Sequence, residues 1–259
     1  MACMPLLLGH RANTPRWIRS YLRCADGVEI DVTLHNGRLV ASHILPDTRP
    51  RLLRERLARL LETIHLSGPY GLEDLVSLVP PESAILFDLK TARAAHQLAG
   101  FLEGLSRSSL VMVATRWHSL VGLLKTDGVR VLLSLDSRPA RPVELVEAAG
   151  ADGVSVRAEY IDEEFVEELH SHGYLVTAWT VNMSGEAARL QAYGVDVIVT
   201  EYPCELRALA GRCRKRMDWP SRWGARVLVQ RPAMAEAVMP ASHPLGPTYG
   251  ARQAARGGA

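Results

Sequence analysis

The chain has 259 residues, of which 47% are apolar, so it can bury one large core and still carry an appendage. No apolar run approaches the roughly 20 residues of a membrane-spanning helix, so we expect no transmembrane segment. The net charge is +2, but it is unevenly distributed: residues 211–259 hold nine Arg and Lys against two Asp and Glu, so the rest of the chain is acidic. Nucleic-acid binding requires a basic surface, so this acidic body argues against a nucleic-acid partner.

Four cysteines, Cys3, Cys24, Cys204 and Cys213, are spread along the chain without a Cys-x-x-Cys pair. We therefore expect isolated reduced thiols in a cytoplasmic protein. The apolar run Met4–Leu8 is too short for a secretory signal, which supports the same expectation.

Short apolar runs alternate with longer amphipathic stretches, a rhythm that is typical of repeated β–α units. The apolar runs are nearly continuous, which favours parallel strands covered on both faces. Eight such strands with helical crossovers predict a closed TIM (β/α)8 barrel of class α/β. The expected strands are Pro5–Gly9, Gly27–Val32, Ile85–Leu89, Leu110–Ala114, Val131–Leu135, Gly153–Val156, Leu175–Val181 and Asp196–Thr200.

A small hairpin and helical insertion follows the second strand. Asn36-Gly37 between two apolar runs indicates a tight turn, and Arg38–Ser42 is expected to pair back onto the second strand. Residues Arg49–Leu78 are expected to contain helical segments. Further helices are expected at Arg93–Leu105, at Pro142–Ala149, and from Ile161-Asp162-Glu163-Glu164-Phe165 to a stop at Gly173.

From Gly211 onward, five prolines and scattered arginines replace the periodic pattern. We expect a barrel domain over residues 1–210 and a basic, poorly ordered tail over residues 211–259. The basic stretch Arg212–Arg216 is expected to be a solvated charge run.

Polar residues gather at the C-terminal ends of the first three barrel strands and at the end of the hairpin. In a TIM barrel these strand ends surround one mouth, where active sites lie. Charged side chains on apolar barrel strands are costly to bury without a partner, so their coincidence at one end predicts a functional site. The residues are His10, Arg11, Glu29, Asp31, His43, Asp88 and Lys90.

The carboxylates suit a metal ion. Glu29 and Asp31 are two residues apart and therefore face the same side of their strand, and Asp88 comes from the next strand. Three oxygen ligands without paired cysteines favour Mg²⁺ or Ca²⁺ over zinc. An ordinary pairing of Asp88 with Lys90 is the simpler alternative.

The remaining mouth residues suit phosphate chemistry. Arg11 and Lys90 are cations that can bind phosphate oxygens. His10 and His43 have the pKa range needed for proton transfer. The other histidines, His35, His65, His96, His118, His170 and His172, are expected in helices or turns away from the mouth.

Six motifs follow one another between Leu6 and Pro203. The first four are His10-Arg11, Glu29-x-Asp31-Val32, a hairpin that ends in His43, and Asp88-x-Lys90. The last two are Trp179-Thr180-Val181-Asn182 and the run Gly194–Pro203. This order resembles the glycerophosphodiester phosphodiesterase family. The chain departs from that pattern where Ala12-Asn13-Thr14 follow His-Arg directly, where Ile44 follows His43, and where Asp88 replaces the usual Glu.

The resemblance implies a phosphoric diester hydrolase of lipid and glycerol metabolism. It would hydrolyse glycerophosphodiesters to glycerol 3-phosphate and an alcohol through a cyclic phosphate. The implied roles are metal binding for Glu29, Asp31 and Asp88, acid–base catalysis for His10 and His43, charge stabilisation for Arg11 and Lys90, and a substrate-binding apolar wall at Trp179.

Two alternatives remain open on the same barrel. One is an intracellular phosphodiesterase of the lysophospholipase D type, and the other is a degenerate barrel that binds phosphorylated ligands without hydrolysing them. The partner is a small molecule in each case, and the sequence leaves open the head group, the choice between Mg²⁺ and Ca²⁺, and the oligomeric state.

Overall fold

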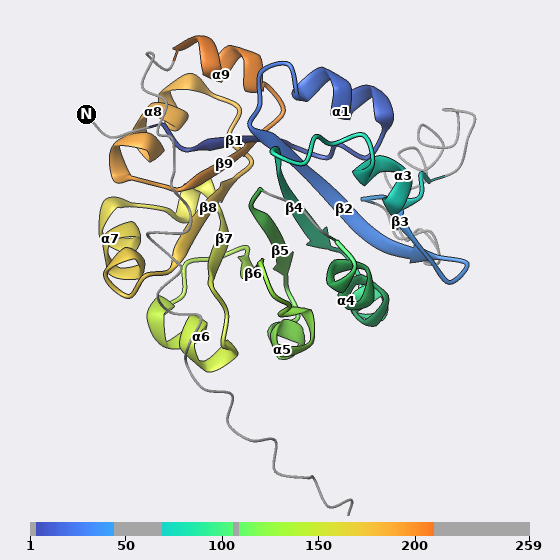
Figure 1. The fold of residues 1–259 in the computed structure, drawn as a ribbon. Coiled ribbons are helices and arrows are strands. Elements are labelled where there is room, and N and C mark those ends of the chain that lie inside the picture. Colours follow the sequence, from blue (N-terminus) through green and yellow to red (C-terminus); the bar gives the residue numbers. More distant parts are fainter. Residues whose placement is uncertain (1–3, 44–68, 106–108, 210–259) are drawn as a thin grey trace, which may run out of the picture. The chain divides into compact units, whose positions relative to one another are not determined.

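The computed structural model describes residues 4–43, 69–105 and 109–209 (Figure 1). Eight parallel strands form a closed barrel, because β1 pairs with β2 on one side and with β9 on the other. The predicted TIM barrel is therefore confirmed. The strands are β1 (Leu6–Gly9), β2 (Gly27–His35), β4 (Ala84–Leu89), β5 (Val111–Thr115), β6 (Val129–Leu135), β7 (Gly153–Arg157), β8 (Leu175–Trp179) and β9 (Val197–Thr200).

A hairpin extends β2 beyond the barrel. The added strand, β3 (Arg38–Ala41), pairs antiparallel with β2, as expected. Asn36 and Gly37 both have positive φ, 49° and 75°, as the two central residues of a type I′ hairpin turn require. Because the hairpin continues β2, that strand runs three residues past the predicted end at Val32. Short helix α3 (Leu72–Val76) follows, and the rest of the helical material expected from Arg49 to residue 68 lies outside the described residues.

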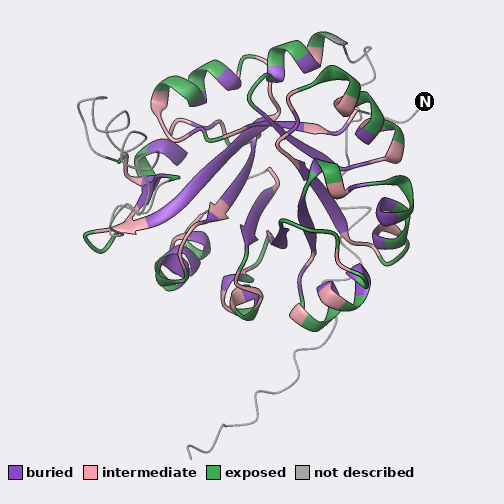
Figure 2. Cartoon of the chain, turned by 180° about the vertical axis from the view of Figure 1, so that it is seen from behind, coloured by how far each residue is buried: buried purple, intermediate pink, exposed green. Residues whose placement is uncertain are grey.

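Helices surround the barrel on its outer side (Figure 1). Each follows a strand and packs its apolar face on the sheet, while its other face is exposed (Figure 2). The α-helices are α1 (Pro15–Tyr21), α4 (Ala95–Glu103), α5 (Val121–Leu124), α6 (Pro142–Ala149), α7 (Glu163–Ser171), α8 (Ser184–Tyr193) and α9 (Pro203–Leu209), with 3-10 turns at Ala92–Ala94, His118–Leu120 and Ala158–Tyr160. Among the described residues, no helix is both long and apolar enough to cross a membrane.

Helix ends follow local sequence signals. Asp162 caps α7, since its side chain accepts a hydrogen bond from the Phe165 backbone N–H at 2.9 Å. Pro142 occupies the first turn of α6, and Gly150 ends that helix in the left-handed region at φ 67°. These signals place the two predicted helices within a few residues of their observed bounds.

Successive residues of a barrel strand face two different environments, the core beneath the helices and the interior of the barrel. Val28 and Ile30 on β2 belong to the hydrophobic core between the sheet and the helices. Glu29 and Asp31 alternate with them and therefore point into the barrel. The apolar residues of β2 hold the strand in place, and the same register brings the carboxylates to the inner face.

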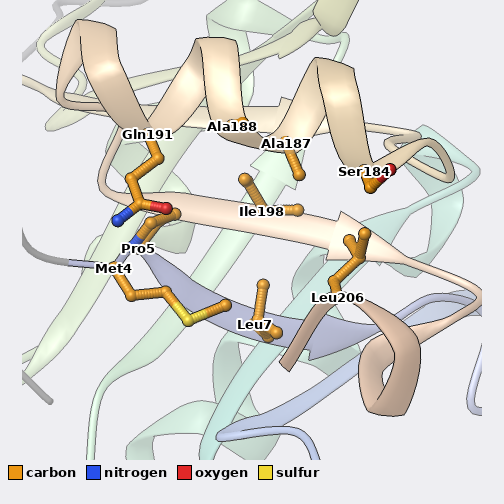
Figure 3. A pocket seen from close by; sticks show the side chains of 9 residues that line it. All are labelled: Met4, Pro5, Leu7, Ser184, Ala187, Ala188, Gln191, Ile198 and Leu206. Atoms are coloured by element: carbon orange, nitrogen blue, oxygen red, sulfur yellow. The ribbon is translucent and has the colours of Figure 1, made fainter. Parts of the chain in front are cut away.

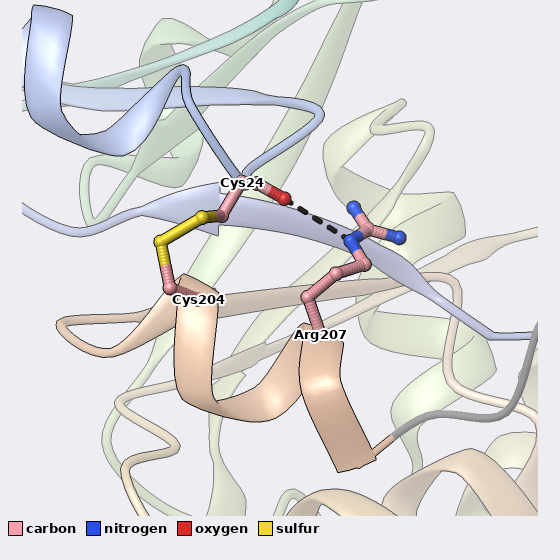
Figure 4. The surroundings of a disulfide bond; sticks show 3 residues. All are labelled: Cys24, Cys204 and Arg207. Carbon is pink, nitrogen blue, oxygen red and sulfur yellow. Dashed lines mark hydrogen bonds between the residues drawn. A yellow bond between two sulfur atoms is a disulfide. The ribbon is translucent and has the colours of Figure 1, made fainter.

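A disulfide corrects the expectation of isolated thiols. Cys24 lies between α1 and β2, and Cys204 lies in the first turn of α9, 180 residues later (Figure 4). Barrel closure brings these segments together, so no local spacing motif could reveal the pair. Arg207 joins them as well, because its Nε donates to the Cys24 carbonyl at 3.1 Å and its guanidinium forms an ion pair with Asp26. The argument for a cytoplasmic protein from unpaired cysteines does not hold for this pair.

A small apolar cavity lies where α8 and α9 cover β1 and β9 (Figure 3). Ile198 and Leu7 form its floor, and Ala187 and Leu206 close it from the two helices. None of the described residues that line it is charged, so this cavity is a packing gap remote from the carboxylates at the barrel mouth.

Candidate active site

Three carboxylates meet at the C-terminal ends of β2 and β4. Asp31 is the register partner of Asp88, and Glu29 lies two residues before Asp31 on the same face. One ligand oxygen from each lies within 4.8 Å of the others. Glu29 and Asp31 are only 4% and 0% exposed. Buried carboxylates at this spacing repel one another, so the cluster requires positive charge.

The Glu29 side chain has one unsatisfied oxygen. Its Oε2 accepts a hydrogen bond from the Arg11 backbone N–H at 2.6 Å, whereas its Oε1 is buried with no hydrogen-bond partner among the described residues. Burial and the neighbouring Asp31 raise the pKa of Glu29 well above its ordinary value. A buried polar atom without a partner is unusual in a folded protein. A hard divalent cation would provide that partner and offset the repulsion, so these residues fit a divalent metal ion.

Lys90 already supplies part of the positive charge. Its Nζ lies 2.6 Å from Asp31 Oδ1 and forms an ion pair with Asp88 Oδ2. Burial alone would lower the pKa of Lys90, but Asp31 and Asp88 raise it above its ordinary value. The pairing of Asp88 with Lys90 that the sequence allowed is therefore present. It leaves Glu29 Oε1 without a partner among the described residues, so it does not replace a metal ion.

Asn13 fixes the orientation of Asp31. Its Nδ2 donates to Asp31 Oδ2 at 2.7 Å, and its Oδ1 accepts from the Asp31 backbone N–H at 3.0 Å. Burial alone would raise the pKa of Asp31, but hydrogen bonds from His43 and Lys90 hold it below its usual range. Asp31 is therefore an ionised carboxylate in a fixed position.

His43 is oriented by two neighbours. Arg11 Nη2 donates to His43 Nε2 at 2.9 Å, and His43 Nδ1 lies 3.4 Å from Asp31 Oδ1. A guanidinium can only donate, so we assign the proton of the neutral ring to Nδ1, facing Asp31. Asp31 thus provides the carboxylate partner that Ile44, the residue after His43, cannot offer. Arg11 itself has φ 52°, and this turn aims its backbone N–H at Glu29.

His10 is held in a similar way by Glu201. Its Nδ1 lies 3.4 Å from Glu201 Oε1, and its Nε2 lies 4.0 Å from Glu29 Oε2. Asn182 positions Glu201 by donating from Nδ2 to Oε2 at 3.1 Å and by accepting from the Glu201 backbone N–H at 3.0 Å. Burial and Arg11 lower the pKa of His10, although Asp31 and Glu201 partly offset them. The ring is therefore neutral near pH 7 and can accept a proton.

The far wall of the mouth has different chemistry. Arg116 directly follows β5, and its guanidinium carbon lies 5.9 Å from the centroid of the Trp179 ring at the end of β8. Ser134 on β6 and Ser155 on β7 line the same cavity. This wall therefore presents hydroxyl groups, a cation and one aromatic ring.

The structure brings all of the predicted site residues together. His10, Arg11, Glu29, His43, Asp88, Lys90 and Trp179 line one cavity, and Asp31 contacts them from its base. His35, His96, His118, His170 and His172 do not line this cavity, whereas His65 lies outside the described residues. The sequence interpretation missed Asn13, Arg116, Ser134, Ser155 and Glu201. Arg116 and Glu201 directly follow barrel strands, and that position was a usable signal.

The fold and this site define a TIM-barrel protein whose mouth combines a candidate divalent-metal centre with paired histidines and cations. Residues 83–205 match the model of the Glycerophosphoryl diester phosphodiesterase family. This match, the curated relative and the solved structures support the family that the motif order from His10 to Pro203 predicted.

One curated relative is YhdW of Bacillus subtilis, a candidate glycerophosphodiester phosphodiesterase. It is 40% identical over 53 residues, which are 20% of this chain and 22% of YhdW, so the match covers about a fifth of that relative.

Solved structures share the fold at low identity. A phosphodiesterase of Oleispira antarctica, in complex with the product sn-glycerol-3-phosphate, has a TM-score of 0.66 at 19% identity and covers 80% of this chain and 96% of its own. A glycerophosphodiester phosphodiesterase of Thermotoga maritima has a TM-score of 0.62 at 20% identity, with coverage of 79% and 98%.

Proposed function

We propose that this protein hydrolyses glycerophosphodiesters to glycerol 3-phosphate and an alcohol. The observation that carries the proposal is the buried Glu29 Oε1, which has no partner among the described residues and lies in a carboxylate cluster between two oriented histidines. The match of residues 83–205 to the family model and the product bound to the Oleispira phosphodiesterase support the same substrate class.

The carboxylates are the proposed metal ligands. Glu29, Asp31 and Asp88 would hold a divalent ion, for which three oxygen donors favour Mg²⁺ or Ca²⁺. When bound, the ion would lower the pKa of a substrate hydroxyl and neutralise charge on the phosphate.

The histidines are the proposed acid–base pair. Glu201 and Asp31 hold the Nδ1 sides of His10 and His43, so proton transfer would use the Nε2 atoms. In His43 this atom also accepts a hydrogen bond from Arg11. One imidazole would take the proton of the glycerol hydroxyl next to the phosphodiester as its oxygen bonds to phosphorus. The other would protonate the alcohol as its bond to phosphorus breaks, which leaves a cyclic phosphate. Water would then add to phosphorus, and the ring oxygen would leave as the hydroxyl of glycerol 3-phosphate.

Arg11 and Lys90 are the proposed stabilisers of phosphoryl charge. Both line the cavity beside the carboxylates. Cations fixed where negative charge develops stabilise a transition state more than the ground state. Trp179 would form an apolar wall for the glycerol carbons. Such a role belongs to lipid and glycerol metabolism, and a cytoplasmic location is part of this proposal.

The test is release of glycerol 3-phosphate from glycerophosphocholine, glycerophosphoethanolamine and glycerophosphoglycerol in Mg²⁺, Ca²⁺ or EDTA. The proposal expects release that requires a divalent ion. Hydrolysis of lysophospholipids alone would favour the lysophospholipase D alternative. Binding of these diesters without hydrolysis by folded protein, in any of the metal conditions, would favour the non-catalytic barrel.

A further inference from the structure

The cavity wall formed by β5, β6 and β7 has no part in the proposed chemistry. In barrel order, β6 and β7 lie across from β1 and β2, which carry the histidine and carboxylate wall. Arg116, Ser134 and Ser155 project into the cavity from this far wall. A diester centred on the metal and histidines would direct its leaving alcohol away from them, toward these three residues.

The two serines present unused hydrogen-bonding groups. Ser134 and Ser155 are register partners on β6 and β7, and they are 7% and 3% exposed. Neither hydroxyl bonds to another described residue. Thr177, the next residue in the same row on β8, also has a buried Oγ1 without a partner among the described residues. A row of hydroxyls on an inner barrel face is costly unless a ligand or water bonds to it.

Arg116 adds a cation above the serines. Its Nη2 donates to Asp136 Oδ1 at 2.9 Å, but Asp136 does not line the cavity. A guanidinium has five N–H donors in a planar fork, so one bond to Asp136 leaves donors for an oxygen ligand. Arg116 therefore offers N–H donors to an anionic group at the rim of the cavity, and the two serines offer hydroxyl groups beneath it.

Trp179 does not provide the bare aromatic face that a quaternary ammonium requires. Such cations bind over the faces of aromatic rings. Here the guanidinium of Arg116 lies 5.9 Å from the centroid of that ring, so a cation of the protein occupies the position that the ammonium group of a ligand would need. Arg116 would also repel a positively charged head group.

We propose that Arg116, Ser134 and Ser155 form the leaving-group subsite, which selects a head group with an anionic oxygen group, such as a carboxylate, over a purely cationic one. This inference rests on the proposed hydrolysis of glycerophosphodiesters and specifies its substrate class. Arg116 acts as the specificity-determining residue.

Glycerophosphoserine and glycerophosphoethanolamine differ only by the carboxylate of serine, so their kcat/KM ratio isolates its contribution. The wild-type protein is expected to prefer glycerophosphoserine by about 10-fold or more, the effect of a hydrogen bond between charged groups. Arg116→Gln abolishes that preference. Arg157→Gln is the matched control, because Arg157 ends β7, pairs with Glu159 and does not line the cavity.

Binding separates a failure of this inference from a failure of the proposed function. In the His10→Ala protein, with and without Arg116→Gln, calorimetry measures the dissociation constants of the same two diesters without turnover. A 10-fold preference that depends on Arg116 supports the subsite even if neither diester is hydrolysed. Equal affinities in the presence of Arg116, or an equal loss for both diesters in Arg116→Gln, overturns it. The second result would mean that Arg116 contacts the shared phosphate.

Discussion

Asn13 and Asp31 are joined by two hydrogen bonds, one from side chain to side chain at 2.7 Å and one from the Asp31 backbone N–H to Asn13 Oδ1 at 3.0 Å. The short turn after Arg11 therefore controls the direction of a proposed metal ligand. Partners of this kind orient ligands and tune the affinity of a metal site.

Asn13→Ala is expected to weaken divalent-ion binding by about 10- to 100-fold, because Asp31 loses the hydrogen bond to its carboxylate Oδ2 and the one from its backbone N–H. Titration calorimetry with Mg²⁺ or Ca²⁺ measures the change. Gln97→Ala, on the exposed side of α4, is a control that removes an amide without touching the site. Unchanged affinity in folded Asn13→Ala protein would show that Asn13 does not support a metal ligand.

Glu201→Ala is expected to lower kcat by about 10- to 100-fold with little change in KM, because His10 loses the carboxylate that holds its Nδ1. Steady-state rates for one diester measure the two parameters. Glu205→Gln, at an exposed position in the first turn of α9, is the control. A rise in KM at constant kcat would instead assign Glu201 to substrate binding.

The disulfide between Cys24 and Cys204 is expected to stabilise the fold, because it restricts an unfolded chain over a separation of 180 residues. Its removal in Cys24→Ser/Cys204→Ser should lower the free energy of unfolding by about 2–4 kcal/mol. Denaturant unfolding with and without dithiothreitol measures this. The reductant should destabilise the wild-type protein and leave the double variant unchanged. If dithiothreitol destabilised both proteins equally, its effect would come from other thiols and not from this disulfide.

Asp162 makes the stability of α7 depend on pH. Hydrogen bonds from Arg138 and from the Phe165 backbone N–H lower the pKa of Asp162. A group whose pKa is lower in the folded state stabilises the protein above its unfolded pKa, about 3.9, and this contribution disappears as pH falls through the folded value. Asp162→Ala should therefore cost about 1 kcal/mol near pH 7, the value of a helix cap.

The control for Asp162 is Asn, which retains an acceptor for the Phe165 N–H but not the charge. Urea unfolding at neutral pH should place Asp162→Asn between the wild type and Asp162→Ala. The gap between the wild type and Asp162→Asn should close at acid pH. A gap that stays constant across the pH range would contradict the pKa direction of Asp162.

Most of the barrel could be predicted because its determinants are local. Apolar runs such as Ile85–Leu89 fall at strands, and Asp162 and Gly173 mark the two ends of α7. The carboxylate cluster was also predictable, since the strand period of two and the common rim of a parallel barrel bring Glu29, Asp31 and Asp88 together.

The remaining features depend on contacts between distant segments. Cys24 meets Cys204 only because β1 closes the barrel between β2 and β9. Glu201 reaches His10 across the same closure. Ser134 and Ser155 are ordinary residues in sequence and become notable only through their register and burial. No local pattern encodes these pairings.

Glu29→Gln is the most direct test of the central claim, because it removes the charge from the unsatisfied carboxylate and retains its shape. The rate of glycerol 3-phosphate release, measured in saturating Mg²⁺ or Ca²⁺, should fall by about 1000-fold, since the contribution of a bound metal is several kcal/mol. The variant should remain folded, with a melting temperature no lower than that of the wild type, because a buried charge is lost. Release within about threefold of the wild-type rate would contradict a metal-dependent mechanism centred on Glu29.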